Sequence, residues 1–388
     1  MMDVVIAGIG QIPVGEHYEL SLRQMGVRAL RAAVKDSGGL QPQALYIGNM
    51  LSSMVSHQAN LGALFTDYAN LGHIESYTAE ASGASGAAAL RLGYLAILSG
   101  YVDTVAVLGV EKWTDMAHSE SETAAAQGLD TDYEGIQGLT ESGQAGLLMQ
   151  RYLFEHNLPA DALGGFAVQA HANAVHNPNA FYRKAIDLET YAKAPLTNAP
   201  LNLYDAAPYA DGAAALILTR RDLLPKDHQG PVVRMLGSAV SIDTLAWHDR
   251  HDPLALKAAK NAVQSACAQA GIMPVYTDVL ELDDSYSIYA ALTLEACGYA
   301  EPGEAPRLAR EGLLAPTAKL PAMTMGGCKA RGNPIGAKGV YQAVEAALQL
   351  RGECGENQVK DARLAVTLAL GGPASTAIAH VFDVVREV

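Results

Sequence analysis

Cysteine is scarce in this sequence, and its spacing excludes two common kinds of site. The 388 residues include four cysteines, Cys267, Cys297, Cys328 and Cys354, and no two of them form a Cys-x-x-Cys pair. Neither a zinc site nor a redox-active pair is therefore indicated, and we expect no bound metal. Isolated thiols are typical of a reducing compartment, so we expect a cytoplasmic protein.

Positive charge is also in short supply. The sequence contains 27 lysines and arginines against 41 aspartates and glutamates, which gives a formal net charge of −14. Binding to nucleic acid needs a basic surface, so we expect no nucleic-acid partner.

Long apolar runs are missing as well. No run is long and clean enough to span a membrane, so we expect no membrane contact. The first residues, MMDVVIAGIG, lack the basic segment of a signal peptide and instead predict a strand at 3–8.

The residues that are present predict an α/β protein with two similar halves. Hydrophobic residues make up 49% of the chain, aromatic residues only 6%, and glycine occurs 37 times. A chain of this length is too long for one small core, so two domains or two halves are expected. The expected strands cover residues 3–8, 44–48, 104–109, 232–236, 279–282, 364–370 and 377–384. The expected helices cover residues 20–37, 58–71, 254–270, 286–297 and 339–350.

The recurring order of strand and helix suggests a duplicated unit. We place the N-terminal half at residues 1–230 and the C-terminal half at 231–388, on either side of a polar break at 226–230. Composition changes over about 114–200, where charges, Asn and His appear, and we interpret this segment as a mostly helical insertion in the first half.

The segment that organises the chain is 79–100, AEASGASGAAALRLGYLAILSG. Its Leu and Ala residues leave almost no polar side, so we expect a helix that is buried on all sides. The start of such a helix carries unpaired N–H groups and a partial positive charge. It would suit an anion, a thiolate or an oxyanion near Ser82 and Gly83.

Five collinear motifs carry a resemblance to a known family. They are VVIAGIGQIPVG, EASGASGAAAL, DAAPYADGAAALIL, DVLELDDSYS and MGGCKARGNPIGAKG. Together they resemble the thiolase superfamily, and within it the sterol-carrier-protein-x or lipid-transfer-protein type, which is acetyl-CoA acetyltransferase-like. The resemblance implies a duplicated αβαβα layered sandwich, a homodimer at least, and a coenzyme A thioester as substrate or ligand, with no other cofactor.

The same motifs depart from the family where the chemistry is done. In the family, a Cys at the helix start takes the acyl group and a His in the H-P-x-G loop activates it. The Cys position falls here on Gly83, the loop His on Asn333, and the His of the H-D-x-F motif on Asp283. The position of the distal Cys lies near Ala369. A Ser82–Asn333 pair cannot replace them, because an amide does not accept a proton near neutral pH.

Three functions remain open. The first is carbon–carbon bond cleavage or formation on an acyl-CoA without an acyl-enzyme, with Asp283 as a general base whose pKa burial raises. Asn333 and the amides of Gly83 and Ala84 would then bind the thioester oxygen. Steroid side-chain retro-aldolases of this family, which lack the Cys, look similar and imply a small OB-fold, zinc-ribbon partner protein. The second is a non-catalytic acyl-CoA-binding or scaffold subunit, and the third is a conventional thiolase that uses Ser82.

The predicted ligand contacts each have a structural alternative. The predicted substrate-binding residues are Gly83, Ala84, Lys329, Arg331, Gly332, Gly371 and Gly372. Lys329 and Arg331 are the best local charges for phosphate, or they pair with acidic neighbours.

For several single residues, a structural role is the alternative to a chemical role. Ser82 alternatively caps the helix, and Asp283 alternatively lies in a solvated turn or caps the helix at 286–297. Asp284 is expected to hold a loop, and Tyr286 and Cys328 to pack. His171 and His176 are expected at the surface.

Overall fold

The computed structural model describes residues 3–225 and 230–385, and nine of the described strands form one mixed sheet. Its order is β3-β2-β4-β7-β1-β8-β11-β10-β9. Parallel pairing is confined to β3–β2–β4 and β9–β10, and the other pairs are antiparallel. The first half contributes β1 (Val4–Gln11), α1 (Leu22–Asp36), β2 (Ala44–Gly48), α2 (Ser52–Val55), α3 (Leu61–Tyr68), β3 (Glu75–Ala79), α4 (Ser85–Leu98), β4 (Thr104–Glu111) and β7 (Gly212–Arg220). The second half contributes β8 (Val232–Ile242), α9 (Lys257–Ala270), β9 (Val279–Glu281), α10 (Ser287–Ala296), α11 (Ala305–Arg310), α12 (Lys338–Arg351), β10 (Leu364–Gly371) and β11 (Thr376–Val385).

The two halves repeat one topology. When the five strands of the first half are numbered by their order in the chain, they lie side by side in the order third, second, fourth, fifth, first. In the second half the order is β9-β10-β11-β8. A parallel bridge between Leu280 and Ala322 lies beside β9, at the place that corresponds to the third strand of the first half. The halves join where β1 meets β8, through Val5 opposite Arg234 and Ile6 opposite Val233. The predicted duplication is therefore confirmed.

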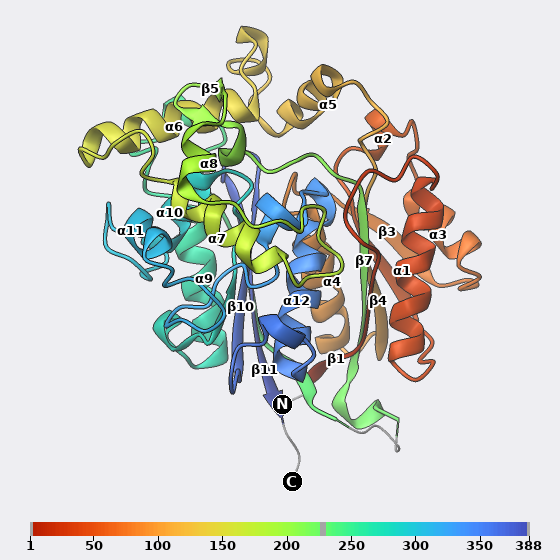
Figure 1. The fold of residues 1–388 in the computed structure, drawn as a ribbon. Coiled ribbons are helices and arrows are strands. Elements are labelled where there is room, and N and C mark those ends of the chain that lie inside the picture. Colours follow the sequence, from red (N-terminus) through yellow and green to blue (C-terminus); the bar gives the residue numbers. More distant parts are fainter. Residues whose placement is uncertain (1–2, 226–229, 386–388) are drawn as a thin grey trace.

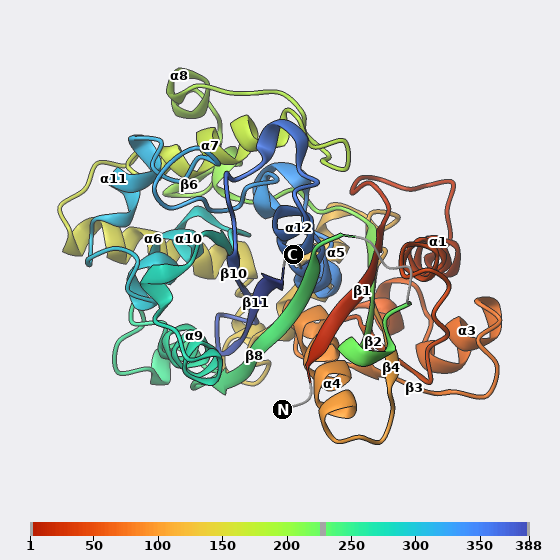
Figure 2. The ribbon, with the colours of Figure 1, turned by 90° about the horizontal axis from the view of Figure 1, so that it is seen from below.

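Each half of the chain contributes one half-sheet, β3-β2-β4-β7-β1 or β8-β11-β10-β9. Helices fill the space between these half-sheets and cover their outer faces. Helices α4 and α12 lie together between the two half-sheets, with α1 and α3 outside the first and α9 and α10 outside the second (Figures 1 and 2). This is the predicted αβαβα layering. Small residues allow the central helices to touch: a Cβ on Gly339 would come within 2.5 Å of the Ala87 nitrogen, and one on Gly86 within 3.0 Å of the Val340 nitrogen.

The organising helix differs from its prediction in two ways. Residues 75–79 form the edge strand β3, and α4 begins only at Ser85. The strand was missed because its sequence, ESYTA, is polar and mostly exposed. Leu95 and Leu98 are 42% and 37% exposed, so burial on all sides was wrong. They lie three residues apart on the one face that neither the sheets nor α12 covers.

The expected insertion is mainly helical. It contains α5 (His118–Ala125), α6 (Glu141–Glu155), α7 (Gly164–Ala174), α8 (Leu188–Ala192) and β5 (Leu196–Asn198), and β6 (Leu201–Asn202) follows directly after it. Figure 1 shows α5 and α6 across the top of the molecule and α7 lower, in front of its middle. The polar break at 226–230 lies, except for residue 230, outside the described residues.

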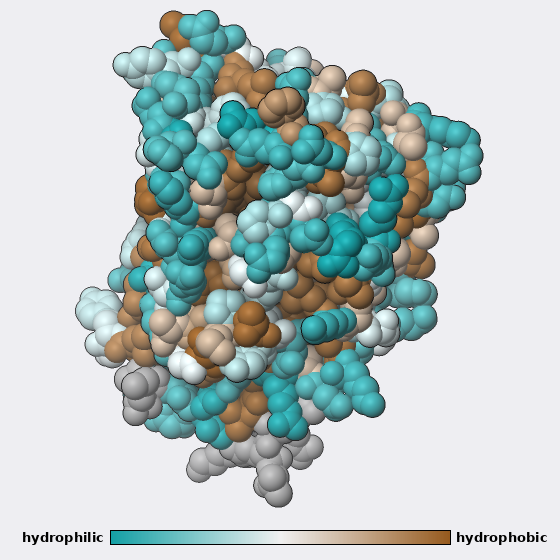
Figure 3. Space-filling model, turned by 90° about the vertical axis from the view of Figure 1, so that its left-hand side faces the viewer, coloured by the Kyte–Doolittle hydropathy of each residue, from teal (hydrophilic) through white to brown (hydrophobic). Residues whose placement is uncertain are grey.

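The surface mixes polar and apolar side chains. Figure 3 views the molecule from the side of α9 and α11 and shows scattered apolar residues among polar ones. Exposed apolar side chains of this scattered kind are ordinary on a folded protein. Among the described residues, no helix has the length and apolar character needed to cross a bilayer.

Candidate functional site

The start of α4 meets four other segments at a small cavity. The cavity measures about 10 Å³ and is lined by Gly83, Glu141, Asp283, Ser285, Tyr289, Asn333, Ile335, Lys338, Leu370 and Gly372. That volume is about what one water molecule requires. The structure thus brings together four of the predicted site residues, Gly83, Asp283, Asn333 and Gly372, at the helix tip.

Asp283 forms a buried ion pair with Lys338. The Lys338 Nζ lies 2.5 Å from Asp283 Oδ2, and the two side chains are 5% and 0% exposed. Asp283 also accepts hydrogen bonds from the backbone N–H groups of Ser285 (3.0 Å) and Leu370 (3.2 Å). Burial raises the pKa of Asp283, but the Lys338 ammonium and the hydrogen bonds outweigh it, and the pKa lies below its usual range. Asp283 is therefore an ionised partner of Lys338.

The expected pKa rise at Asp283 was wrong, and so were both structural alternatives for this residue. Its carboxylate is fully buried, so it does not lie in a solvated turn. Helix α10 begins at Ser287 with Tyr286 at the N-cap, so Asp283 does not cap it.

Lys338 occupies the space that a side chain at position 83 would need. A Cβ built on Gly83 would lie 2.6 Å from Lys338 Nζ and 2.8 Å from the Leu370 carbonyl oxygen. Burial lowers the pKa of Lys338, but the Asp283 carboxylate outweighs it and raises the pKa above its usual value, so the side chain is an ammonium. Sequence reasoning missed this residue. Its one signal was the Lys in GNPIGAKG where the family motif has Thr.

Asn333 presents an amide to the same cavity. Its backbone N–H donates to the Pro208 carbonyl (3.1 Å), and it forms a bridge with Tyr209. Its side chain is buried, and within the described part of the chain its Oδ1 has no hydrogen-bond partner. Asn333 therefore has hydrogen-bonding capacity to offer a ligand.

Ser82 faces away from this cluster. It has a left-handed backbone (φ 50°), and its hydroxyl donates to Met50 Sδ at 3.4 Å. The hydroxyl contacts no base in the described ranges, so the structure does not support Ser82 as a nucleophile. The helix-cap alternative was also wrong, because Ala84 is the N-cap residue. The Ala84 N–H donates to the Ala81 carbonyl (3.0 Å) and so is already paired, which removes one of the two expected oxyanion donors.

Arg331 pairs with an acidic neighbour. Its guanidinium donates to Glu345 Oε2 at 2.6 Å, both side chains are buried, and it lies over the Tyr341 ring. It lines neither cavity, so its role as a phosphate ligand was wrong and its alternative is confirmed. The glycines Gly332 and Gly371 likewise serve packing, since a Cβ would come within 2.6 Å of Val14 Cγ1 and 2.2 Å of the Ala81 oxygen respectively.

The remaining loop residues mostly have structural roles. Asp284 accepts hydrogen bonds from the backbone N–H groups of Cys328 (2.5 Å) and Lys329 (3.3 Å), which confirms that it holds the loop. Cys328 is buried, as expected. Tyr286 is buried with its ring edge against Tyr289, and it also lines the larger cavity described next.

A second, open cavity of about 790 Å³ adjoins the helix tip. The two share neighbouring residues: Ser142 and Tyr286 line the larger cavity and follow directly after Glu141 and Ser285 of the smaller one. The exposed cations Arg183 and Lys184 line it, and so does Lys329. The Lys329 ammonium itself donates to the carbonyls of Asp205 (2.6 Å) and Tyr204 (3.4 Å).

His171 also lines the larger cavity. It is buried and stacks on Tyr182, so its expected surface position was wrong, because the insertion folds over it. His176 is exposed, as expected.

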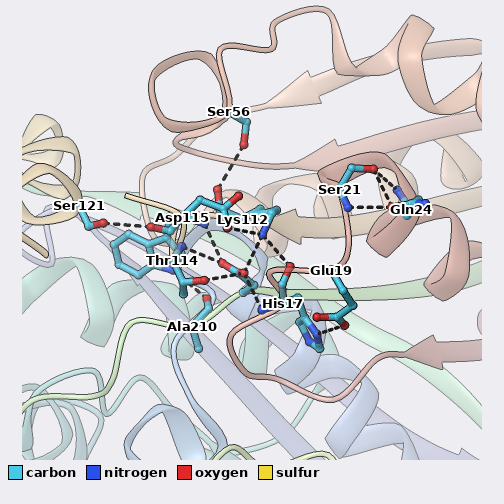
Figure 4. Close-up of polar contacts among 12 residues, drawn as sticks. His17, Glu19, Ser21, Gln24, Ser56, Lys112, Thr114, Asp115, Ser121 and Ala210 are labelled. Carbon is cyan, nitrogen blue, oxygen red and sulfur yellow. Dashed lines mark hydrogen bonds and ion pairs between the residues drawn. The ribbon is translucent and has the colours of Figure 1, made fainter. Parts of the chain in front are cut away.

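One wall of the larger cavity is fixed by Asp211. Its carboxylate accepts hydrogen bonds from the backbone N–H groups of Trp113 (2.8 Å) and Thr114 (3.0 Å) and from the Thr114 hydroxyl (2.8 Å). The Lys112 ammonium lies 3.3 Å from the same carboxylate and donates to the His17 carbonyl (Figure 4). Since Trp113 and Thr114 line the cavity, this network sets the wall before a ligand arrives.

Neither cavity contains a recognisable metal site. Across residues 3–225 and 230–385, no group of three or more His, Cys, Asp or Glu side chains is placed to hold a metal ion.

Fold and site together define a duplicated α/β protein with a polar cavity at the tip of a central helix. Residues 4–222 match the family model "Thiolase, N-terminal domain" and residues 239–384 match "Thiolase C-terminal domain-like". The chain belongs to the thiolase family. It is 36% identical over 385 residues to an acetyl-CoA acetyltransferase of Methanothermobacter thermautotrophicus, covering 99% of this chain and 100% of the relative.

Two further matches involve proteins that are named as parts of assemblies. The benzoylsuccinyl-CoA thiolase subunit BbsB of Thauera aromatica is 28% identical over 374 residues, covering 95% of this chain and 94% of the relative. The solved structure named Ltp2-ChsH2(DUF35) aldolase superposes with a TM-score of 0.85 at 22% identity, covering 99% of this chain and 98% of that chain. The structural match supports the fold.

Proposed function

We propose that this protein binds an acyl-CoA thioester and makes or breaks a carbon–carbon bond without forming an acyl-enzyme. The observation that carries this proposal is the Lys338–Asp283 ion pair beside Gly83. An ammonium stands where the family places its nucleophile, so no group at that position can take an acyl chain.

The ion pair and Asn333 supply what an enolate needs. In the aldol-type cleavage of a β-hydroxyacyl-CoA, the electrons of the breaking bond collect on the thioester oxygen. The Lys338 ammonium is a hydrogen-bond donor in a buried cavity, where such a donor stabilises an oxyanion strongly, and the side-chain NH2 of Asn333, not its Oδ1, would be the second donor. Asp283 is a positioning residue in this scheme, because it holds Lys338 charged and in place.

The larger cavity supports binding of the coenzyme A portion of a thioester substrate. Its volume, its exposed cations Arg183 and Lys184 and its preset wall suit a long ligand with phosphates at one end. Its position beside the helix tip would direct a thioester toward Lys338 and Asn333.

The proposal also includes a partner protein, a homodimer and a cytoplasmic location. The matched assembly named Ltp2-ChsH2(DUF35) and the subunit BbsB support a partner protein, which we propose to be a small OB-fold, zinc-ribbon protein. A homodimer is supported by the exposed edge strand β3 (Glu75–Ala79), which can pair with a second copy. The four buried cysteines carry no disulfide, which supports a reducing cytoplasm.

The test is turnover by wild-type protein and by K338M. Racemic 3-hydroxybutyryl-CoA and 3-hydroxy-3-phenylpropanoyl-CoA serve as probes, and released acetyl-CoA is measured by liquid chromatography and mass spectrometry. We expect release by the wild type and at least a 100-fold lower kcat for K338M, and no acetylated chain in the intact-mass spectrum. An acylated protein would contradict the proposal.

A second candidate is a non-catalytic acyl-CoA-binding or scaffold subunit. It is favoured by the size of the helix-tip cavity, which at about 10 Å³ has room for one water molecule. This candidate predicts that coenzyme A or the partner raises the melting temperature while neither probe is turned over. Release of acetyl-CoA that requires Lys338 would rule it out.

A further inference from the structure

Helix α6 of the insertion places a carboxylate in the same cavity as the ion pair. Glu141 is the first residue of α6, and the helix begins there because the Thr140 hydroxyl accepts a hydrogen bond from the Gly143 N–H (3.1 Å). Its side chain lines the helix-tip cavity together with Asp283, Lys338 and Asn333. Through residues 3–225 and 230–385, the Glu141 carboxylate has neither a hydrogen-bond donor nor an ion-pair partner, unlike the fully engaged Asp283.

The groups around Glu141 come from four parts of the chain. Lys338 faces it from α12, Asp283 and the rings of Tyr286 and Tyr289 from the segment 283–289, Glu122 from α5, and Tyr209 from the segment before β7. Burial raises its pKa to about 7, with Asp283 and Glu122 adding to the rise and Lys338 opposing it. A carboxyl group with this value exchanges its proton close to neutral pH.

We propose that Glu141 is the residue that takes up and returns the proton in the reaction proposed above, on which this inference rests. Its carboxylate removes the proton from the β-hydroxyl of the substrate. The Cα–Cβ bond then breaks, the β-carbon leaves as an aldehyde or ketone, and the electron pair moves into the thioester enolate held by Lys338 and Asn333. The resulting carboxylic acid returns the proton to the α-carbon, so Glu141 ends as it began and no further reactant is consumed.

The assignment gives the inserted helix a chemical role. Lys338, Asn333 and Asp283 all come from the second half, whereas Glu141 comes from the insertion in the first half, next to the larger cavity that Ser142 and Glu122 line. Glu141 and Lys338 both line the helix-tip cavity that adjoins the larger one, so the reacting end of a substrate that enters from the larger cavity would meet both groups. The reaction requires a base and oxyanion donors at one site.

The experiment compares E141Q, E141D and E155Q with the wild type on the same two probes. Glu155 lies at the other end of α6, where it pairs with Arg151 at the surface, so E155Q is a matched control for charge and helix. We expect kcat to fall at least 100-fold in E141Q, to fall less in E141D, and to stay within twofold in E155Q. Coenzyme A should raise the melting temperature of E141Q by as much as it raises that of the wild type, which would show that the variant folds and binds coenzyme A.

Two further readouts separate proton transfer from a structural role. The acid limb of the wild-type kcat/KM profile, near pH 7, should be absent from the residual activity of E141Q. Carbon-13 labelling of the glutamate carboxyl groups should show a resonance that titrates near pH 7 and is missing in E141Q, whereas the other glutamate resonances that titrate in this range, such as that of Glu111, remain.

The possible failures can be told apart. If wild type is active and E141Q stays within threefold of it, or if no such resonance titrates, Glu141 is not the proton carrier while the proposed function stands. If the wild type turns over neither probe, the proposed function fails and this inference fails with it.

Discussion

The side chain of Lys338 fills the space where residue 83 would carry its own. A Cβ on Gly83 would lie 2.6 Å from Lys338 Nζ, closer than real Cβ atoms come to another atom. In the sequence, a Gly at the nucleophile position and a Lys in the loop motif look like two separate departures from the family. In the structure they are linked, because the Lys338 ammonium, paired with Asp283, fills the space beside Gly83.

The first prediction concerns the fit of Gly83. G83A should destabilise the protein by about 1–3 kcal/mol, because the new methyl group meets both Lys338 and the Leu370 carbonyl oxygen, and the backbone oxygen cannot swing away. The control is G135A, where the nearest atom lies 3.7 Å from the new Cβ. It should stay within about 0.5 kcal/mol of the wild type. Urea unfolding measures both, and equal stability of the two variants would contradict the close fit.

The second prediction concerns the buried ion pair. K338M and D283N should each cost about 3–5 kcal/mol, because each leaves a charge or a set of hydrogen bonds unpaired in the interior. The double variant should cost clearly less than the sum, since it leaves no lone charge. The exposed pair Arg307–Glu304 provides the control cycle, and its coupling should be below about 1 kcal/mol. Additive losses at Lys338 and Asp283 would show that the pair is not coupled.

Much of the fold could be predicted from the sequence. The duplicated layering and most strands followed from apolar runs and from five motifs in the right order. The role of Asp284 in holding the loop at 328–329 was also predicted from its place in a motif, and its carboxylate accepts hydrogen bonds from the backbone N–H groups of that loop. Edge strand β3 was missed because half-exposed polar strands lack an apolar pattern.

The active cluster was only partly predictable. Asp283 and Asn333 were found because they replace motif residues, but the charge state of Asp283 depends on Lys338, which lies 55 positions further along the chain. Glu141 stands in an insertion that shows no motif, and only the packing of α6 over the helix tip brings it to the site. Sequence spacing does not reveal contacts of this kind between distant elements.

The third prediction concerns pH. The folded-state pKa of Glu141 is about 7, above the usual value of about 4.3 for a glutamate. Folding therefore favours its protonated form, and the stability linked to this group is present below about pH 4 and is lost as pH rises through 7. Glu111, with a pKa of about 7, and Glu281, whose pKa burial also raises, act in the same direction. His171 and His380, whose pKa values burial lowers, act in the opposite direction. Because these groups are common to both proteins, the melting temperature between pH 5.5 and 8.5 should fall further in the wild type than in E141Q. Parallel curves for the two proteins would contradict the assigned value.

The last prediction concerns the cations of the larger cavity. Arg183 and Lys184 are exposed and line it, whereas Arg331 is committed to Glu345 and Lys329 to backbone carbonyls. R183E/K184E should therefore weaken coenzyme A binding at least tenfold without changing the melting temperature of the free protein, because both side chains lie at the surface. The matched control is K257E/K260E on α9, which makes the same change in net charge on the outer face of the other half. Isothermal titration at two salt concentrations should show a loss of salt dependence only in the first variant, since screening acts on the charges that face the phosphates. If both variants bind equally well, the phosphates do not lie at Arg183 and Lys184.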